Sequence, residues 1–284
     1  MVEERERSES GELHAGAVVY LANRECPWRC LMCDLWTDTL EETTAPGSIP
    51  RQVRAALAQT GPVRQVKLYN AGSFFDPRAI PPEDHAAIAQ ALSGIERVIV
   101  ECHPALVSRK CRSFADALDG ALEVALGLET ANEVVLARLN KGMTVADYAR
   151  AAEKLAAGGI ALRTFLLVGL PFSGRDESLS WCRRSIAAAF DAGSTAVSLI
   201  LTRAGNGAMD ALARAGEFTR PDLAMLEEAS GFGVSLARGR VFADLWGLEL
   251  AAECAACLPA RIERLRGQND SQSVGPPVSC ERHG

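Results

Sequence analysis

A helix followed directly by a strand decides the fold class of this chain, and it lies at Thr144–Pro171, TVADYARAAEKLAAGGIALRTFLLVGLP. Thr144 and Asp147 form a capping-box pattern, and apolar residues then recur with the helical period as far as the Gly158–Gly159 pair. The nearly continuous apolar run Arg163–Val168 follows, as expected for a strand that is buried on both faces. Such an alternation of helix and buried strand predicts a parallel α/β fold.

Similar apolar runs recur along the chain with helical segments between them. They are Ala17–Leu21, Val63–Tyr69, Arg97–Glu101, Leu122–Glu129 and Ala196–Leu201. Together with the run at Arg163–Val168 they make six strand–helix units within 185 residues, whereas a complete eight-unit barrel needs about 250 residues. The spacing therefore favours a partial barrel of six units over residues 13–205, or an open doubly wound sheet.

The segments on either side of this region differ in composition. Residues 1–12 are mostly Glu, Arg and Ser, and residues 268–284 are rich in Ser, Pro and Gly, so we expect both ends to be disordered. Residues 206–267 predict a mainly helical extension, with helices at Ala208–Ala215 and Pro221–Ala229 and a strand near Arg240–Leu245.

Composition excludes several classes of protein. The chain has 284 residues, of which 48% are hydrophobic, and no apolar run reaches the roughly 18 to 20 residues of a membrane helix. We therefore expect a cytoplasmic protein without a membrane partner. A net charge of −6 argues against nonspecific nucleic-acid binding, and nine cysteines in such a chain favour metal binding or catalysis over disulfides.

Three cysteines, Cys26, Cys30 and Cys33, follow the first predicted strand and are separated by three and two residues. Three thiolates are one short of the usual four-cysteine iron–sulfur set, and also one short of a closed zinc site. A [4Fe–4S] cluster with three cysteine ligands leaves one iron open to a small molecule, whereas the alternative interpretation is a zinc knuckle.

This loop resembles the three-cysteine signature of the radical S-adenosylmethionine (SAM) superfamily. The resemblance implies a partial (β/α)6 barrel, a [4Fe–4S] cluster on the three cysteines and SAM bound at the open iron. It further implies reductive cleavage of SAM to a 5′-deoxyadenosyl radical that abstracts hydrogen from a substrate. The family often has an aromatic residue before the last cysteine, where this chain has Met32, an apolar residue that can pack on adenine.

The ends of the later strands carry the residues that the resemblance assigns to SAM. These residues are Asn70, Gly72, Ser73, Glu101, Glu129, Val168 and Gly169. Functional groups gather at the C-terminal ends of parallel strands, which supports the assignment. Taken singly, Gly72 is more typical of a turn between a strand and a helix. Each glutamate is equally typical of a solvated or arginine-paired carboxylate, and Val168 with Gly169 of a core strand that ends in a turn.

Other polar residues near these strand ends have ordinary interpretations as well. His103 is either a polar loop residue or a group for proton transfer. Lys141 recurs in the relatives that the chain resembles, but a cation at a helix end is the alternative. We interpret Cys102, Cys111 and Cys182 as small buried apolar residues.

The order of the later motifs resembles one branch of the superfamily over about residues 17–265. That branch contains the radical SAM enzymes that complete archaeosine in archaeal tRNA and, more distantly, the elongator-type and methylthiotransferase-like enzymes. A tRNA base and a small metabolite both stay open as substrates, with an electron donor such as flavodoxin or ferredoxin. Arg261, Arg264 and Arg266 form either a phosphate-binding strip or a solvated helix face. The competing class is a non-catalytic zinc- or Fe–S-binding interaction module.

A second cysteine pair, Cys254 and Cys257, lies in the C-terminal extension. Cys280 and His283 follow after a gap of 22 residues and would complete four ligands, for zinc or for a second cluster. The alternative is that Cys254 and Cys257, one helical turn apart, pack their helix against the barrel.

Overall fold

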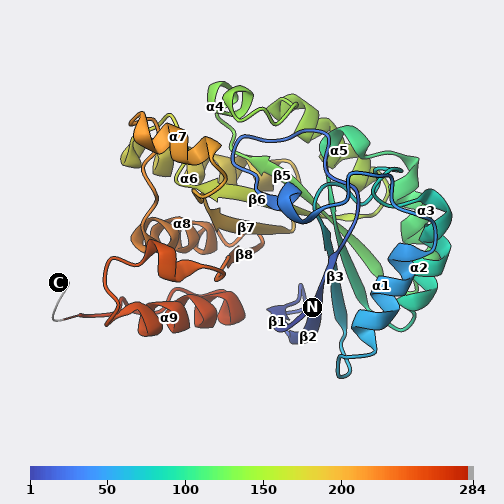
Figure 1. Ribbon diagram of the computed structural model, residues 1–284. Coiled ribbons are helices and arrows are strands. Elements are labelled where there is room, and N and C mark those ends of the chain that lie inside the picture. Colours follow the sequence, from blue (N-terminus) through green and yellow to red (C-terminus); the bar gives the residue numbers. More distant parts are fainter. Residues whose placement is uncertain (281–284) are drawn as a thin grey trace.

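The computed structural model describes residues 1–280, and its strands form one sheet in the order in which they occur along the chain (Figure 1). The sheet is parallel from β2 to β8, whereas β1 pairs antiparallel with β2. The strands are β1 (Val2–Arg7), β2 (Leu13–Leu21), β3 (Gln65–Asn70), β4 (Arg97–Cys102), β5 (Ala121–Glu129), β6 (Ala161–Val168), β7 (Ala196–Leu201) and β8 (Arg240–Ala243). All six predicted strands are present, and the sheet curves into a nearly closed barrel, which confirms the barrel and excludes the open doubly wound sheet.

Helices cover the outer surface of the barrel (Figure 1). They are α1 (Ser48–Leu57), α2 (His85–Ala91), α3 (Arg109–Ala117), α4 (Glu133–Arg138), α5 (Val145–Ala157), α6 (Arg175–Asp191), α7 (Ala208–Arg214), α8 (Leu223–Ser235) and α9 (Leu258–Ser271). Short 3-10 turns, η1 (Leu35–Asp38), η2 (Pro82–Asp84), η3 (Pro104–Leu106) and η4 (Leu248–Ala251), lie in the connections. The predicted capping box is formed, because Thr144 and Asp147 exchange hydrogen bonds at the start of α5.

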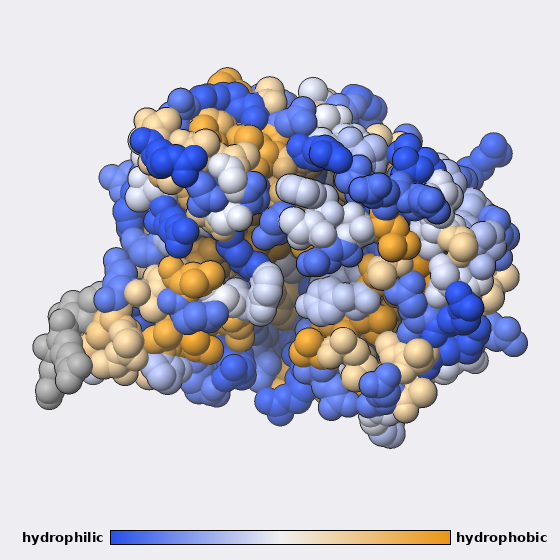
Figure 2. Space-filling view, in the orientation of Figure 1, coloured by the Kyte–Doolittle hydropathy of each residue, from blue (hydrophilic) through white to orange (hydrophobic). Residues whose placement is uncertain are grey.

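The main hydrophobic core lies between the sheet and these helices. On β6, Leu162, Leu166 and Val168 belong to this core, while Arg163 binds charged partners from other strands of the barrel. Successive side chains of a strand point to opposite faces, so the two sets of residues separate cleanly. Hydrophilic side chains cover most of the face shown in Figure 2, and apolar ones form separate patches.

The N-terminus is a strand rather than the disordered segment we expected. Glu4 and Glu6 of β1 contact the ammonium of Lys67 at 2.6 and 2.7 Å, and Glu6 also binds Arg163 at 2.5 Å. The charges that suggested disorder are therefore neutralised inside the barrel. An alternating Glu/Arg pattern can form a strand when one of its faces meets buried cations.

The centre of this network is a carboxylate on β5. Arg163 Nε lies 2.6 Å from Glu123 Oε1, and Arg97 and Arg240 reach the other oxygen of Glu123 at 2.6 and 3.2 Å. Burial alone would raise the pKa of Glu123, but Arg163 and Arg240 lower it to about 2. Removing one member of such a network leaves an unpaired buried charge, which typically costs about 3–5 kcal/mol.

The C-terminal segment is also ordered as far as the description extends, contrary to the disorder expected from residue 268 onward. Helix α9 ends at Ser271, and Arg264 donates hydrogen bonds to Gly275 O at 3.2 and 3.1 Å. The Ser, Pro and Gly content predicted a solvated tail, but side chains of α9 hold the segment in place.

Helix α9 occupies the gap between the two edge strands, β1 and β8 (Figure 1). The Asn269 amide exchanges two hydrogen bonds of 2.9 Å with the backbone of Ala243, and Gln272 does the same with Val241 at 2.6 and 3.0 Å. Arg5 and Arg7 of β1 donate to Asp270. Side-chain amides thus satisfy the free edge of β8, which would otherwise be an unpaired sheet edge.

The extension over residues 206–267 does not stand apart from the barrel. It supplies α7, α8 and most of α9 as well as β8, the strand expected near Arg240–Leu245, which pairs in parallel with β7. No helix in the described part of the chain is both long and apolar enough to cross a membrane.

Candidate active site at the cysteine loop

The three cysteines of the loop after β2, Cys26, Cys30 and Cys33, are each half-buried, and we call them the loop triad. Arg29, within the loop, adopts the left-handed backbone conformation at φ 44°, as do Glu129 at φ 63° and Asn140 at φ 55°. This conformation is uncommon for residues other than glycine and costs free energy that the surrounding contacts must offset. Hydrogen bonds from Asn140 and Asn206 to the loop backbone hold the loop in this conformation.

The segment after α4 holds the first half of the loop. Leu31 N donates to Leu139 O at 2.9 Å, and the Asn140 amide donates to the carbonyl oxygens of Trp28 and Arg29 at 3.2 and 3.3 Å. Gly142, at φ 68°, lies so close to the Trp28 ring that a Cβ there would be 2.7 Å from Cδ1. A glycine is therefore required at position 142 by both conformation and space.

His103 stacks on Trp28 with ring centroids 3.7 Å apart and an interplanar angle of 11°. Its Nδ1 accepts a hydrogen bond from Ala105 N, so Nε2 is the protonated nitrogen and donates to Lys141 O at 2.9 Å. Burial lowers the pKa of His103 to about 4, and the ring is neutral at pH 7. Both ring nitrogens therefore fix the ring in place, and the ring holds the loop by stacking on Trp28, which corresponds to the polar loop residue rather than to a proton-transfer group.

Asn206 holds the second half of the loop from the start of α7. Its amide nitrogen donates to Leu31 O at 2.7 Å and to Cys33 O at 3.3 Å, and its oxygen accepts from Met209 N. Sequence reasoning missed this residue as well as Trp28 and Asn140. An Asn–Gly pair before a helix was a visible signal for Asn206, but only of helix capping.

An ion pair of low exposure, Lys141 with Glu129 at 2.6 Å, lies beside the loop triad. Burial would lower the pKa of Lys141, but the Glu129 carboxylate and the Cys30 thiol raise it above its ordinary value. A Cβ at Gly127 would lie 2.3 Å from Glu129 Oε1 and 2.6 Å from Lys141 Nζ, so the pair sits directly over this glycine. Lys141 is thus a partner of Glu129 and not simply a cation at a helix end.

The thiols of the loop triad resist ionisation when no cation is bound. Burial raises the pKa of Cys30 to about 11, with smaller upward contributions from Glu129, Cys33 and Cys26, while Lys141 acts in the opposite direction. Burial likewise raises the pKa values of Cys26 and Cys33. The positive charge of bound iron would offset this cost, since metal binding releases the thiol protons.

The polar residues at the ends of β3 and β4 gather in one place. Glu101 Oε2 accepts a hydrogen bond from Asn70 N at 3.1 Å, and burial raises the pKa of Glu101 to about 8. Both polar atoms of the Asn70 amide are buried without a hydrogen-bond partner among the described residues. Ser73 accepts from His103 N at 3.2 Å. Gly72, at φ 146°, leaves room for Cys26, whose Cβ would be 3.3 Å from a Cβ at position 72.

The remaining sequence-predicted residues, Val168, Gly169 and Met32, pack against apolar residues. Val168 places its side chain in the main core, where it is not available to a ligand, and its carbonyl accepts from Thr202 N at 2.9 Å. Gly169, at φ 83°, is in tight contact with Pro221, and a Cβ there would be 2.4 Å from Pro221 Cβ. Met32 packs against a small second core with Leu139 and Leu167.

The sulfur atoms of the loop triad are not gathered as the ligands of a single metal ion are. Among residues 1–280, one trio of metal-ligating side chains brings all its ligand atoms within 4.8 Å of one another, and it consists of Cys254, Cys257 and Cys280. The thiolates of a [4Fe–4S] cluster bind separate irons, so they lie farther apart than the ligands of one zinc ion. The zinc-knuckle interpretation is therefore disfavoured for this loop.

Curated relatives match more than half of the chain. Archaeosine synthase subunit beta of Thermococcus kodakarensis is 31% identical over 167 residues, which are 55% of this chain and 51% of that protein. Archaeosine synthase subunit beta of Methanosarcina acetivorans is 28% identical over 211 residues, which are 69% of this chain and 60% of that protein. The chain thus spans between half and three-fifths of the lengths of these relatives.

Solved structures share the fold. The crystal structure of methylornithine synthase superposes with a TM-score of 0.60 at 16% identity, covering 93% of this chain and 72% of that one. The archaeal Methanocaldococcus infernus Elp3 superposes with a TM-score of 0.56 at 18% identity, covering 81% of this chain and 56% of that one.

A family profile covers the cysteine loop and the strands that follow it. The Radical SAM superfamily matches residues 20–181, more than half of the chain, and this range includes the whole loop triad. Together with the enzymes among its relatives, the match favours an enzyme over the non-catalytic interaction module. This chain therefore belongs to the radical SAM superfamily of enzymes.

Proposed function

We propose that Cys26, Cys30 and Cys33 hold a [4Fe–4S] cluster at which the enzyme binds and reductively cleaves SAM. When bound, the cluster supplies one electron and an open iron for SAM, and cleavage yields methionine and a 5′-deoxyadenosyl radical that abstracts hydrogen from the substrate. The observation that carries this proposal is the position of the loop triad, which is fixed by Asn140, His103 and Asn206 at the C-terminal edge of the parallel strands.

The surrounding residues offer what SAM requires. The unpaired Asn70 amide and the Glu101 carboxyl provide hydrogen-bonding groups beside the loop, and an unpaired buried amide is rare unless a ligand or water completes it. Gly72 lets backbone approach a ligand closely. The Lys141–Glu129 pair places a cation next to the thiolates and leaves the second carboxylate oxygen of Glu129 for a ligand hydroxyl.

Anaerobic reconstitution tests the proposal. We expect about four irons per chain at the loop triad, and formation of 5′-deoxyadenosine and methionine once dithionite and SAM are added. Cys30→Ala is the matched control, because it removes one ligand and leaves the rest of the loop intact. A wild-type protein that binds no iron and leaves SAM unchanged would contradict the proposal.

We further propose that the substrate is a nucleobase in RNA, as the archaeosine synthase relatives suggest by their name. Trp246 follows β8 at the same edge of the barrel, is 71% exposed and stacks against the Arg203 guanidinium, which lies 4.0 Å from the ring centroid. Trp36, next to the loop triad, is also exposed and has Arg29 over its ring at 5.9 Å. Exposed aromatic and arginine planes of this kind bind unstacked bases in RNA.

A small pocket opens beside Trp246. Thr202 and Arg220 line it, and the Thr202 hydroxyl is buried without a hydrogen-bond partner in the described structure. Its volume of about 40 Å³ admits water rather than a base, so a base would stack on Trp246 at the mouth of the pocket, with the Arg220 cation nearby.

Binding of tRNA to the reconstituted enzyme tests this second proposal. Trp246→Ala should weaken tRNA binding about tenfold, since stacking on one base is worth about 1–3 kcal/mol. Trp246→Phe should retain most of the affinity, and the slow cleavage of SAM without substrate should be the same in both variants. An enzyme that binds no tRNA at low salt, and whose SAM cleavage is stimulated by a small metabolite instead, would contradict an RNA substrate.

We expect flavodoxin or ferredoxin to replace dithionite as the electron donor.

A further inference from the structure

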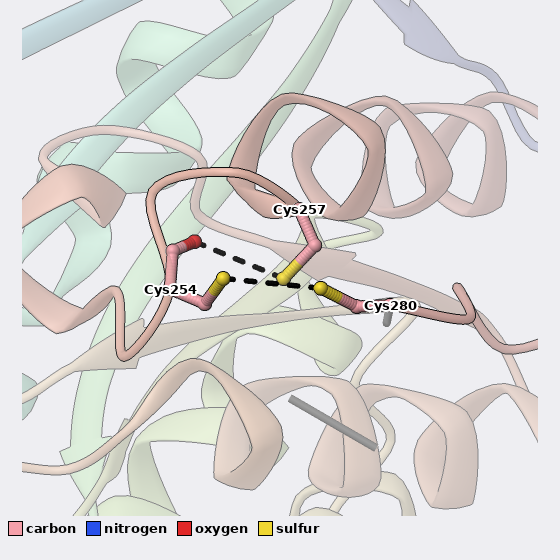
Figure 3. Close-up of side chains that lie close together, drawn as sticks. All are labelled: Cys254, Cys257 and Cys280. Carbon is pink, nitrogen blue, oxygen red and sulfur yellow. Dashed lines mark hydrogen bonds between the residues drawn. The ribbon is translucent and has the colours of Figure 1, made fainter. Parts of the chain in front are cut away.

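Three cysteines far from the active loop come together near the C-terminus. The sulfur atoms of Cys254, Cys257 and Cys280 all lie within 4.8 Å of one another, and we call them the C-terminal triad (Figure 3). Cys254 Sγ and Cys280 Sγ are 3.9 Å apart, well beyond the roughly 2.05 Å of a disulfide bond. Cys257 is buried and the other two are half-buried, so the cluster is partly shielded from water.

Helix packing does not explain this arrangement. Cys257 is the N-cap residue of α9, whereas Cys254 lies before the helix and does not share a helical face with it. Cys280 arrives from the segment that follows α9, and its side chain points at the other two sulfurs in Figure 3. Three thiols from two segments thus converge on one point.

The distances correspond to ligands of a single ion. Zinc–sulfur bonds of about 2.3 Å in tetrahedral geometry place two thiolates about 3.8 Å apart. The 3.9 Å between Cys254 and Cys280 matches that value, whereas a second [4Fe–4S] cluster would need its thiolates on separate irons and farther apart. Thiolates in tetrahedral sets select zinc over hard cations such as magnesium.

The chain between Cys257 and Cys280 lowers the entropic cost of bringing the ligands together. Most of the 22 residues between Cys257 and Cys280 form α9, so little flexible chain must be ordered. Arg264 already fixes the returning segment through Gly275 O. Arg261, whose guanidinium binds Glu227 at 2.7 Å, also contacts the Cys257 side chain and would balance the negative charge of a zinc–thiolate centre.

We propose that Cys254, Cys257 and Cys280 bind one zinc ion that fastens the C-terminal segment to the start of α9. His283, which the sequence spacing offers as a fourth ligand, lies outside the described residues. Three thiolates and a water molecule are sufficient to hold zinc without His283, as in other zinc sites with three protein ligands. The zinc site is independent of the cluster, and its loss leaves the loop triad in place.

Metal analysis of the full-length protein, purified and reconstituted without oxygen, tests this proposal. We expect about one zinc per chain in addition to the cluster iron. Cys280→Ser should lose the zinc and keep the iron, whereas Cys30→Ala should lose iron and keep the zinc. Ser279→Ala, a change of an exposed neighbour, is the control for Cys280→Ser and should keep both metals.

A second variant and a spectroscopic measurement distinguish loss of the zinc site from misfolding of the protein. Cys254→Ser, in the loop before α9, should also lose zinc while its circular dichroism stays that of the wild type. Replacing zinc by Co²⁺ in the wild type should give thiolate-to-cobalt charge-transfer absorption, and Cys280→Ser, which loses the ion, should abolish it. The proposal is overturned if zinc is absent from the wild type, if Cys280→Ser leaves zinc unchanged, if it lowers iron instead, or if thiol titration finds Cys254 and Cys280 oxidised to a disulfide.

Discussion

The two cysteine triads of this enzyme are built in opposite ways. The loop triad comes from eight consecutive residues, yet its sulfurs do not gather around one point. The C-terminal triad spans 27 residues in sequence, and its sulfurs lie within 4.8 Å of one another. Closeness in sequence therefore does not indicate closeness of ligands, and the spacing of the sulfurs distinguishes a cubane cluster from a single ion.

Cys30→Ala should have the largest effect and should separate the two triads. Without this ligand we expect loss of the cluster and a fall in SAM cleavage of more than about 10³-fold, the scale seen when one member of a catalytic unit is removed. The measurement is 5′-deoxyadenosine formed per chain, with iron and zinc counted in the same sample. Cleavage at the wild-type rate would show that the ligand assignment is wrong.

Glu129→Gln should affect the ligand of the cluster and not the cluster itself. The change weakens the 2.6 Å contact with Lys141 and removes a negative charge from the site, so we expect SAM to bind about tenfold more weakly, or about 1.4 kcal/mol. Iron content should stay at the wild-type level. Equilibrium binding of SAM to the reconstituted protein measures the effect, and an unchanged dissociation constant would return Glu129 to a structural ion pair.

Acid should loosen the contacts that hold the loop triad. Burial lowers the pKa of His103 to about 4, so the unfolded chain takes up a proton near pH 6.5 before the folded protein does. The stability that depends on neutral His103 is present above pH 6.5 and is lost as the pH falls towards 4, which amounts to about 2 kcal/mol at pH 5.

His103→Gln isolates this contribution from that of other titrating groups. The difference in thermal midpoint between wild type and variant should shrink as the pH is lowered from 7 to 5. A difference that is independent of pH would show that the stacking on Trp28 does not depend on the charge of the ring.

Removing zinc from the C-terminal triad should have the smallest effect. A zinc-selective chelator, or Cys280→Ser, should lower the thermal midpoint by about 2–4 °C, the shift that about 1 kcal/mol produces in a chain of this size. SAM cleavage per cluster should be unchanged, because the C-terminal triad does not contribute to the loop that holds the iron. A parallel loss of cleavage and zinc would show that the two triads are coupled.

Much of the barrel could be predicted from sequence because its strands are buried on both faces. Continuous apolar runs such as Ala196–Leu201 identify such strands directly. The same reasoning failed at Val2–Arg7, because a strand whose inward face meets Lys67 and Arg163 shows no apolar pattern. Composition alone could not reveal those partners, which lie on β3 and β6.

The candidate site shows the same limit. The cysteine spacing and the polar residues at strand ends were visible in the sequence, and in the fold Asn70 contacts Glu101 while Glu129 pairs with Lys141. The residues that hold the loop, Asn140 and Asn206, act through backbone carbonyls of a distant segment. Such contacts carry no sequence signal of their own, because any residue presents a carbonyl.

Helix α9 joins β1 and β8 through contacts between residues that are far apart in sequence. Arg5 and Asp270 meet across 265 residues, and β8 receives its edge partners from Asn269 and Gln272. Contacts of such long sequence separation form late in folding, after the local strand–helix units. We therefore expect β1 to gain its contacts with α9 only after the strand–helix units between them have folded.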